Sequence, residues 1–323
     1  MPNVILVPLD GSDKDVRAAL FADAFAGLVN GRLHFIRVLE TPATMISAGL
    51  ALIDAVPASS ARDRDGIERG FRVMEEQLSD ATRRNASWEI VEAVDVALEL
   101  LRRAEGAADL IVMASRGPGT LERAFFGSVA DAVVRKATSP VVIVPPGTHY
   151  TAGQRVTIGK VLAPMDGSEV SRAALDALAK LVPPGLLEYL LLQIVPPERT
   201  GGYHLPDSVG LGVAASEVPG HSDAVHVKAD LARTRLLEIA QRSQAHGHRV
   251  QVRVIDSGDP ASAIIASMRS ESVDLIAMAT RAAGGVRRAL HGSVATRVAR
   301  ESEVPVFLVA HAAGHAPASN GPA

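Results

Sequence analysis

The stretch VILVPLDGSDKDVRAAL, residues 4–20, is written a second time as KVLAPMDGSEVSRAAL, residues 160–175. Each copy starts with a short apolar run, passes through Asp-Gly-Ser and continues as a helical pattern. The two copies align Asp10 with Asp166, and the same offset of 156 residues aligns Val38 with Ile194. Internal repetition of this kind predicts two structural units built on one plan.

Two later blocks repeat at a second constant offset. ADLIVMASRG, residues 108–117, matches VDLIAMATRA, residues 273–282, and FGSVADAVVRKATSPVVIV, residues 126–144, matches HGSVATRVARESEVPVFLV, residues 291–309. The offset here is 165 instead of 156, so the second unit carries about nine extra residues. We place them in the Gly-, Pro- and Ser-rich segment 196–223, whose role the sequence leaves open.

These offsets divide the 323 residues into two domains. We expect a first repeat at residues 1–147 and a second repeat at residues 157–311, joined by a linker rich in Gly and Pro. Residues 312–323 are expected to form a disordered tail.

Each repeat alternates strand and helix patterns. Expected strands in the first repeat are residues 3–8, 32–38, 87–93, 109–114 and 140–144, with helices near 14–29, 64–85, 95–105 and 127–138. Expected strands in the second repeat are residues 160–164, 186–195, 250–255, 273–279 and 305–309. Several strands are continuously apolar, which is typical of strands covered on both faces. The alternation predicts an α/β fold with two doubly wound parallel sheets.

Composition excludes several classes of protein. The net charge is −3 and aromatic residues make up only 3%, so neither a basic field nor stacking side chains point to nucleic acid. Cysteine is absent, which excludes disulfides and thiolate zinc sites. The N-terminus reads as a strand instead of a signal peptide, and the longest apolar run, residues 189–195, is too short to span a bilayer. We expect a cytoplasmic protein with no membrane partner.

Two loops carry the chemistry of a ligand site. Ligands of open α/β sheets bind beyond the carboxyl ends of the strands, where the strand order reverses. The first loop is Pro8–Ser12, in which Asp10 offers a fixed acceptor, Gly11 allows the turn and Ser12 caps the next helix. The alternative is an ordinary turn with a helix cap.

The second loop, ASRGPGTLERAFFGS, covers residues 114–128. Gly117 permits close approach of the backbone, and Gly127 with Ser128 opens a helix whose N-terminus favours an anion. Arg116 and Arg123 add positive charge. We interpret this loop as a phosphate cradle, although it matches neither a P-loop nor the dinucleotide fingerprint. The alternative is a flexible loop with a plain helix cap.

The motifs VPLDGS, ADLIVMASRG, GSVAD and SPVVIVP resemble the universal stress protein family in its tandem form, over nearly the whole chain. The resemblance implies Rossmann-like sheets with strand order 3-2-1-4-5 and ATP in the first repeat, with Mg²⁺ or Mn²⁺ on the phosphates. The family pattern G-x2-G-x9-G-[ST] puts its first glycine on Ala114, its second on Gly117 and its third on Gly127. The site that it implies consists of Pro8, Asp10, Gly11, Ser12, Val38, Met113, Ala114, Arg116, Gly117, Gly127, Ser128 and Val129.

The second repeat departs further from that pattern. Both early glycines are alanine, at Ala279 and Ala282, while Gly292 and Ser293 remain. An alanine that must adopt positive φ costs about 1 kcal/mol or more. We therefore expect a weak or empty second site around Asp166, Ile194, Ala279, Ala282, Gly292 and Ser293.

The resemblance also implies that the last strands of the two repeats pair antiparallel within the chain, which makes the chain a built-in dimer. Whether two chains pair again is left open, as is the identity of any protein partner. We carry three hypotheses: an ATP-binding regulator in the stress response, a nucleotide-independent scaffold or chaperone-like protein, and a slow ATPase. Efficient hydrolysis is not expected, because no base stands beside the proposed phosphate loop.

Histidine residues invite a metal hypothesis at AHGHR, residues 245–249. We interpret His246 and His248 instead as the end of a helix capped by Gly247, because no third ligand stands at metal-site spacing.

Overall fold

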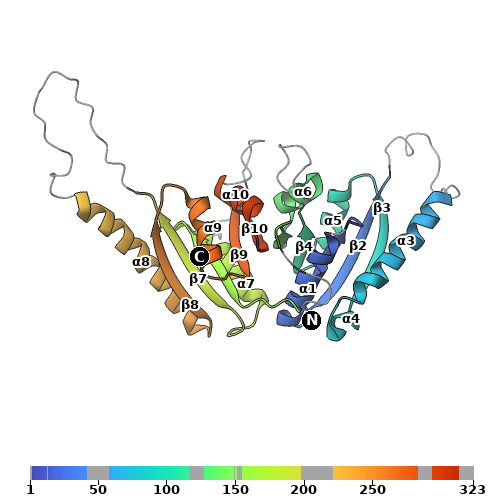
Figure 1. The fold of residues 1–323 in the computed structure, drawn as a ribbon, viewed down its shortest axis with the longest axis horizontal. Helices are drawn as coiled ribbons and strands as arrows, with labels where there is room; N and C mark the ends of the chain where they lie inside the picture. Colours follow the sequence, from blue (N-terminus) through green and yellow to red (C-terminus); the bar gives the residue numbers. More distant parts are fainter. Residues whose placement is uncertain are drawn as a thin grey trace, which may run out of the picture.

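Both repeats form a parallel sheet with helices on its two faces, and the two sheets are joined into one (Figure 1). The structure is a computed structural model that describes residues 2–12, 14–41, 58–115, 127–148, 150, 155–197, 221–282 and 293–312. The expected tail was residues 312–323, but Ala312 is the last residue of a strand; residues 313–323 and most of the segment 196–223 lie outside the described residues. No helix of the described residues is long and apolar enough to cross a membrane.

The expected strands are present in both repeats, with ends that shift by at most three residues. The first repeat contains β1 (Val4–Leu9), α1 (Asp15–Val29), β2 (Arg32–Glu40), α3 (Ala58–Glu75), α4 (Asp80–Arg83), β3 (Ser87–Ala93), α5 (Val96–Ala104), β4 (Leu110–Ala114), α6 (Ser128–Lys136) and β5 (Val141–Val144). The second repeat contains β6 (Lys160–Met165), α7 (Glu169–Leu181), β7 (Glu188–Val195), α8 (His221–Ala245), β8 (Arg249–Asp256), α9 (Pro260–Ser270), β9 (Leu275–Ala282), α10 (Ser293–Glu301) and β10 (Val306–Ala312).

The ten strands lie in the order β3-β2-β1-β4-β5-β10-β9-β6-β7-β8. Each half therefore has the strand order 3-2-1-4-5, which confirms the doubly wound fold. All neighbouring strands within a repeat are parallel. The last strands, β5 and β10, pair antiparallel with Phe307 opposite Val142, so the expected pairing within the chain is also confirmed.

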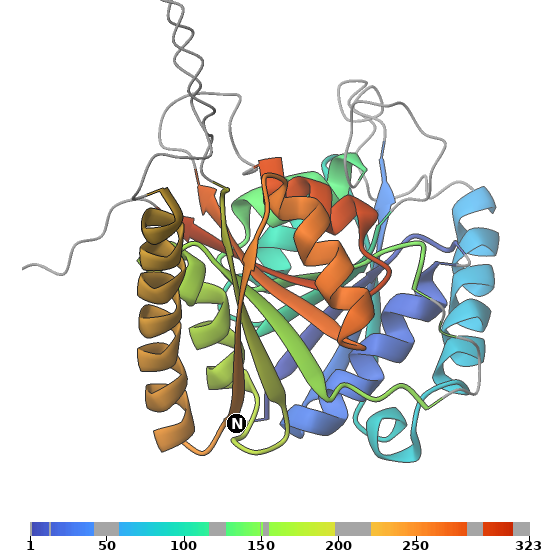
Figure 2. The ribbon, with the colours of Figure 1, turned by 60° about the vertical axis from the view of Figure 1, so that its left-hand side comes forward.

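Helices cover both faces of the sheet, and Figure 2 shows this arrangement from the side of the second repeat. One core cluster packs α1, α3, α7 and α8 against one face, and a second cluster packs α5, α6, α9 and α10 against the other. Each cluster contains side chains from both repeats. The two repeats thus share their cores across the β5–β10 junction.

An aspartate clamps the start of the first strand in each repeat. Asp109 Oδ2 accepts a hydrogen bond from the Val4 amide at 2.8 Å, and Asp274 Oδ2 accepts one from the Lys160 amide at 2.9 Å. The amides of Asp109 and Asp274 donate back to the carbonyls of Val4 and Lys160. The aligned sequence blocks therefore correspond to the same contacts in space.

The prediction of one continuous helix over residues 64–85 is wrong, because the structure has two helices in this segment. α3 ends at Glu75 and the short α4 starts at Asp80. Between them, Ser79 donates from its amide and its hydroxyl to the carboxylate of Asp23 on α1, at 3.0 and 2.7 Å. Ser79 has an extended backbone, which no helix can continue through. This long-range contact with Asp23 is not visible in local periodicity.

Because the two repeats share their cores, we expect them to unfold together in one cooperative transition. Phe307 on β10 is completely buried beside the junction. We expect Phe307→Ala to lower the free energy of unfolding by about 3–5 kcal/mol, because it leaves a large cavity. Urea unfolding followed by circular dichroism should show one transition for both proteins.

Val73→Ala on α3 is the matched control, since Val73 is 60% exposed and should change stability by only about 0.5 kcal/mol. Two separate unfolding transitions, or an equally small effect of Phe307→Ala, would show that the repeats do not share a core.

Candidate functional site

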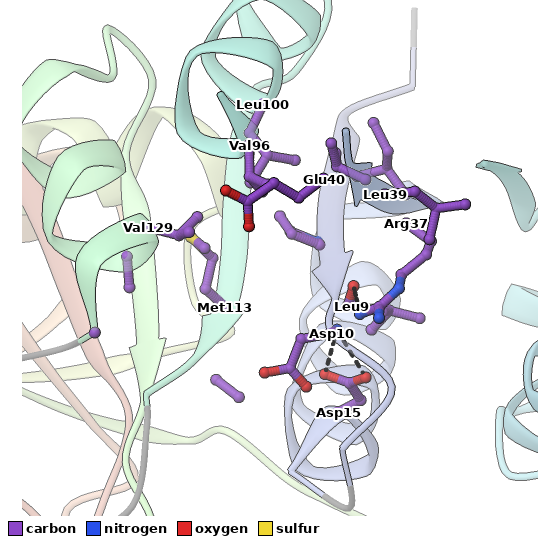
Figure 3. Close-up of a pocket in the computed structure, with 16 residues that line it drawn as sticks. Leu9, Asp10, Asp15, Arg37, Leu39, Glu40, Val96, Leu100, Met113 and Val129 are labelled. Carbon is purple, nitrogen blue, oxygen red and sulfur yellow. Dashed lines mark hydrogen bonds between the residues drawn. The ribbon is translucent and has the colours of Figure 1, made fainter. Parts of the chain in front are cut away.

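A cavity of about 390 Å³ opens at the carboxyl ends of β1, β2 and β4 in the first repeat (Figure 3). β1 lies between β2 and β4, so the cavity marks the point where the strand order reverses. It is lined by Pro8, Leu9, Asp10, Asp15, Ile36, Arg37, Val38, Leu39, Glu40, Val96, Leu100, Met113, Ala114, Gly127, Val129 and Ala130.

The structure brings together most of the residues that the sequence indicates for this site. Those that line the cavity are Pro8, Asp10, Val38, Met113, Ala114, Gly127 and Val129. Gly11, Ser12 and Ser128 adjoin these residues in the chain but do not line the cavity. Arg116 and Gly117 lie outside the described residues.

One part of the cavity is an apolar slot. Val38 on β2 is buried and lines it. Met113 on β4 is also buried, and Leu100 on α5 and Val129 on α6 complete its lining (Figure 3). A slot between aliphatic side chains suits a flat, weakly polar ring. Sequence analysis named Val38, Met113 and Val129 but missed Leu100, which reads as an ordinary core position of an amphipathic helix.

Asp10 lies at the end of β1 with its carboxylate exposed to solvent. The Ser12 amide donates to Asp10 Oδ1 at 2.9 Å. Burial acts to raise the pKa of Asp10, but hydrogen bonding to Ser12 and the charges of Arg37 and Lys14 outweigh burial, so the pKa lies below its usual value. Asp10 is therefore an ionised acceptor at neutral pH.

Asp15, in the first turn of α1, is a site residue that the sequence analysis missed. Its carboxylate is only 4% exposed and accepts hydrogen bonds from the amides of Asp10, at 3.0 Å, and Gly11, at 2.7 Å. Burial, helped by the negative charge of Asp10, raises the pKa of Asp15 to about 6. The repeat alignment marks this position as a difference between the two repeats, because Ser171 in the second repeat aligns with Asp15.

Arg37 on β2 is the second charged residue that the sequence analysis missed. Its Nη1 donates to the carbonyl of Leu9 at 3.1 Å. The guanidinium also lies over Gly11, where Nη2 would be 3.7 Å from an added Cβ. Gly11 has φ of +80°, so the turn needs glycine there. Asp15 and Arg37 together hold the turn in place.

Two further groups complete the cavity. Gly127 has φ of +87° and precedes α6, whose N-terminal amides point toward the cavity end lined by Val129. Glu40 lies at the end of β2, and Figure 3 shows its carboxylate pointing across the cavity toward Val129. The sequence analysis did not name Glu40.

The second repeat has an equivalent cavity of about 360 Å³. Asp166, Ile194, Ala279 and Ser293 line it, as the alignment indicates. Gly292 lies outside the described residues. The expectation that strand 273–279 ends at Ala279 is wrong, because β9 continues through Ala282. Residues 279–282 pair with residues 309–312 of β10, whereas β4 ends at Ala114.

The histidine pair of residues 245–249 is a helix end. α8 ends at Ala245, His246 Nδ1 donates to the carbonyl of Arg242 at 2.7 Å, and Gly247 has φ of +84°. Within the described ranges, no group of three or more His, Cys, Asp or Glu side chains is arranged to hold a metal ion.

Comparison with known proteins agrees with this architecture. The sequence pattern of the universal stress protein family matches residues 1–145 and 157–310, and the chain belongs to that family, with two domains in tandem. A universal stress protein of Mycolicibacterium smegmatis is 22% identical over 306 residues, which cover 94% of this chain and 96% of the relative. Universal stress protein YxiE of Bacillus subtilis is 26% identical over 151 residues, 46% of this chain and 97% of the relative.

Solved structures resemble the chain at the level of the fold. A universal stress protein from Archaeoglobus fulgidus superimposes with a TM-score of 0.62 at 19% identity, over 95% of this chain and 96% of that chain.

The buried carboxyl of Asp15 makes stability depend on pH. Its pKa rises from 3.8 to about 6 on folding, so the folded state binds its proton more tightly than the unfolded state does. The stabilisation is present below pH 4 and is lost as pH rises to about 6, by up to about 3 kcal/mol. We expect Asp15→Asn to lack this loss when urea unfolding is measured from pH 4 to pH 7.

Asp10→Asn is the control, because the pKa of Asp10 shifts in the opposite direction. Between pH 4 and pH 7 its stability relative to the unsubstituted protein should change little, because the contribution of Asp10 is lost only at lower pH, while that of Asp15→Asn should increase. Parallel pH profiles for the Asp15→Asn variant and the unsubstituted protein would contradict the burial argument.

Proposed function

We propose that the protein is an ATP-binding regulatory member of the universal stress protein family, with the nucleotide in the cavity of the first repeat. The observation that carries the proposal is the cavity itself. It combines an apolar slot, an ionised acceptor and a helix N-terminus at a point where the strand order reverses. These are the three surfaces that a base, a sugar and a phosphate chain require.

Different residues along the cavity would bind the base, the sugar and the phosphates. Val38 and Met113 would pack on the faces of the adenine ring. The carboxylate of Asp10 would accept hydrogen bonds from the ribose hydroxyls, and Arg37 and Asp15 would hold its turn in position. The apolar slot and Asp10 lie next to each other, which fits a nucleoside.

The phosphates would lie at the N-terminus of α6. Gly127 has no Cβ to obstruct them, and the free amides of the first turn would donate to their oxygens. Mg²⁺ or Mn²⁺ would bind the phosphate oxygens and neutralise their charge. This fits the described residues, which offer a phosphate-binding helix end but no cluster of protein ligands for an ion.

The second repeat is expected to bind ATP weakly or not at all. Residues 279–282 stay in the sheet ladder with β10, so the backbone does not leave the strand where β4 ends in the first repeat. With one competent site, only the first repeat would bind ATP. A protein partner would then recognise the ATP-bound conformation of that repeat. A cytoplasmic location and pairing of two chains stay predictions.

Slow ATP hydrolysis remains a weaker alternative. The acidic groups nearest the turn are Asp10 and Asp15, and the Asp15 carboxylate is occupied by two backbone amides. A general base must instead reach the attacking water beside the terminal phosphate. Among the described acidic residues of the lining, Glu40 is the one that points toward α6, so Glu40 would be the base of such a reaction.

Gly127→Val tests the proposed site. The added side chain must adopt φ of +87° and occupies the path of the phosphates, so ATP affinity should fall by at least about tenfold. Isothermal titration calorimetry with Mg-ATP measures it.

Gly185→Val is the matched control for backbone strain. Gly185 has φ of +83°, lies in the turn between α7 and β7, and has open space around it. Equal ATP affinity in the two variants, or no ATP binding to the unsubstituted protein, would refute the proposed site.

A further inference from the structure

Three arginines converge behind the Asp-Gly-Ser turn of the second repeat. Arg172 comes from α7, and Arg235 and Arg242 come from α8. All three line a small cavity of about 150 Å³, together with Gly167, Ser171 and Gln193. This cavity shares Met165 and Ser171 with the larger cavity of the second repeat and otherwise has its own lining.

Among the described residues, none of the three guanidinium groups forms a hydrogen bond or an ion pair, and the Nε atom of Arg172 is buried without a partner. Two carboxylates, Glu169 and Glu238, also line the cavity, but neither pairs with an arginine among the described residues. The charged side chains of the lining are thus three arginines and two glutamates, and this excess of positive charge favours an anion.

The first repeat shows what balances a guanidinium at this place. Arg37 lies over Gly11, and the carboxylate of Asp15 sits beside it. That carboxylate accepts the amide of Gly11 at 2.7 Å. The Asp15 carboxylate therefore holds the turn amide and is attracted by the Arg37 guanidinium.

The second repeat keeps the guanidinium but lacks the carboxylate. Arg235 Nη1 is 3.6 Å from the point where a Cβ on Gly167 would lie, compared with 3.7 Å for Arg37 Nη2 at Gly11. Ser171 takes the position of Asp15, three residues after the turn serine, and donates its hydroxyl to the carbonyl of Ser168. The amide of Gly167 has no acceptor among the described residues.

We propose that this cavity binds a phosphate group, which takes the place that the Asp15 carboxylate has in the first repeat. The Gly167 amide and the three guanidinium groups would donate to its oxygens. The volume suits a compact oxyanion. A neighbouring groove of about 540 Å³ shares Arg172 and Arg242 and adds Lys180. The groove has room for an organic body attached to the phosphate group, so the two ligand types to compare are free phosphate and a phosphate ester.

The test restores the missing carboxylate. Phosphate binding is measured by isothermal titration calorimetry in chloride buffers of matched ionic strength, on the full chain. We expect Ser171→Asp to bind inorganic phosphate at least about tenfold more weakly than Ser171→Asn, which has the same size without the charge. Arg235→Gln should lose affinity to a similar extent.

Thermal unfolding provides a second readout. Phosphate should raise the melting temperature of the unsubstituted protein and of Ser171→Asn, and leave that of Ser171→Asp unchanged. Equal phosphate affinity in Ser171→Asp and Ser171→Asn, or no phosphate binding to the unsubstituted protein, would overturn the proposal.

Ribose 5-phosphate distinguishes the two sources of the phosphate group. Binding that is tighter than that of inorganic phosphate and is weakened by Lys180→Gln would support the site with an organic ligand in the groove. Equal affinities, unaffected by Lys180→Gln, would support the site with free phosphate as its ligand.

Discussion

The antiparallel ladder between β5 and β10 is the contact on which the rest of the molecule depends. It covers the inner edge of each five-stranded sheet and buries all four residues of β5. An uncovered parallel edge of such apolar residues would be open to pairing with other chains. Among the described strands, the ladder leaves β3 and β8 as the edges of the sheet, and it draws both repeats into common cores. A duplicated domain has in this way become one folded unit.

Within that unit, the two repeats have similar backbone conformations at the turn after their first strand, but they differ in the charged residues around it. The turn glycines, Gly11 and Gly167, have nearly the same φ, +80° and +82°, and a guanidinium lies over each. In the first repeat Asp15 supplies the balancing carboxylate from within the chain. In the second repeat the arginine, Arg235, comes from helix α8 instead of strand β2, and Ser171 carries no charge. The longer strand β9 adds a second difference at the cavity mouth. The two repeats therefore place different charged groups around the same turn.

Much of this architecture could be predicted from the sequence, because its signals are local and written twice. The strands are short apolar runs, and the turn residues Asp10 and Gly127 stand at constant offsets from their counterparts. Asp15, Arg37 and Glu40 were missed because their roles depend on how the chain folds around the cavity. Asp15 reads as an ordinary acid at a helix start, and only the amides of Asp10 and Gly11 reveal its burial. Arg37 reads as the polar face of a strand. The break after α3 depends on Asp23, and the extension of β9 depends on its partner β10.

The central claim is that one repeat holds ATP and the other does not. The measurement that tests it most directly is the amount of nucleotide bound per chain. The full-length protein is saturated with Mg-ATP, freed of excess nucleotide, denatured, and its released nucleotide quantified by anion-exchange chromatography. The account predicts one ATP per chain. Two ATP per chain would show that the extended β9 does not close the second site, and none would remove nucleotide binding from the function of this protein.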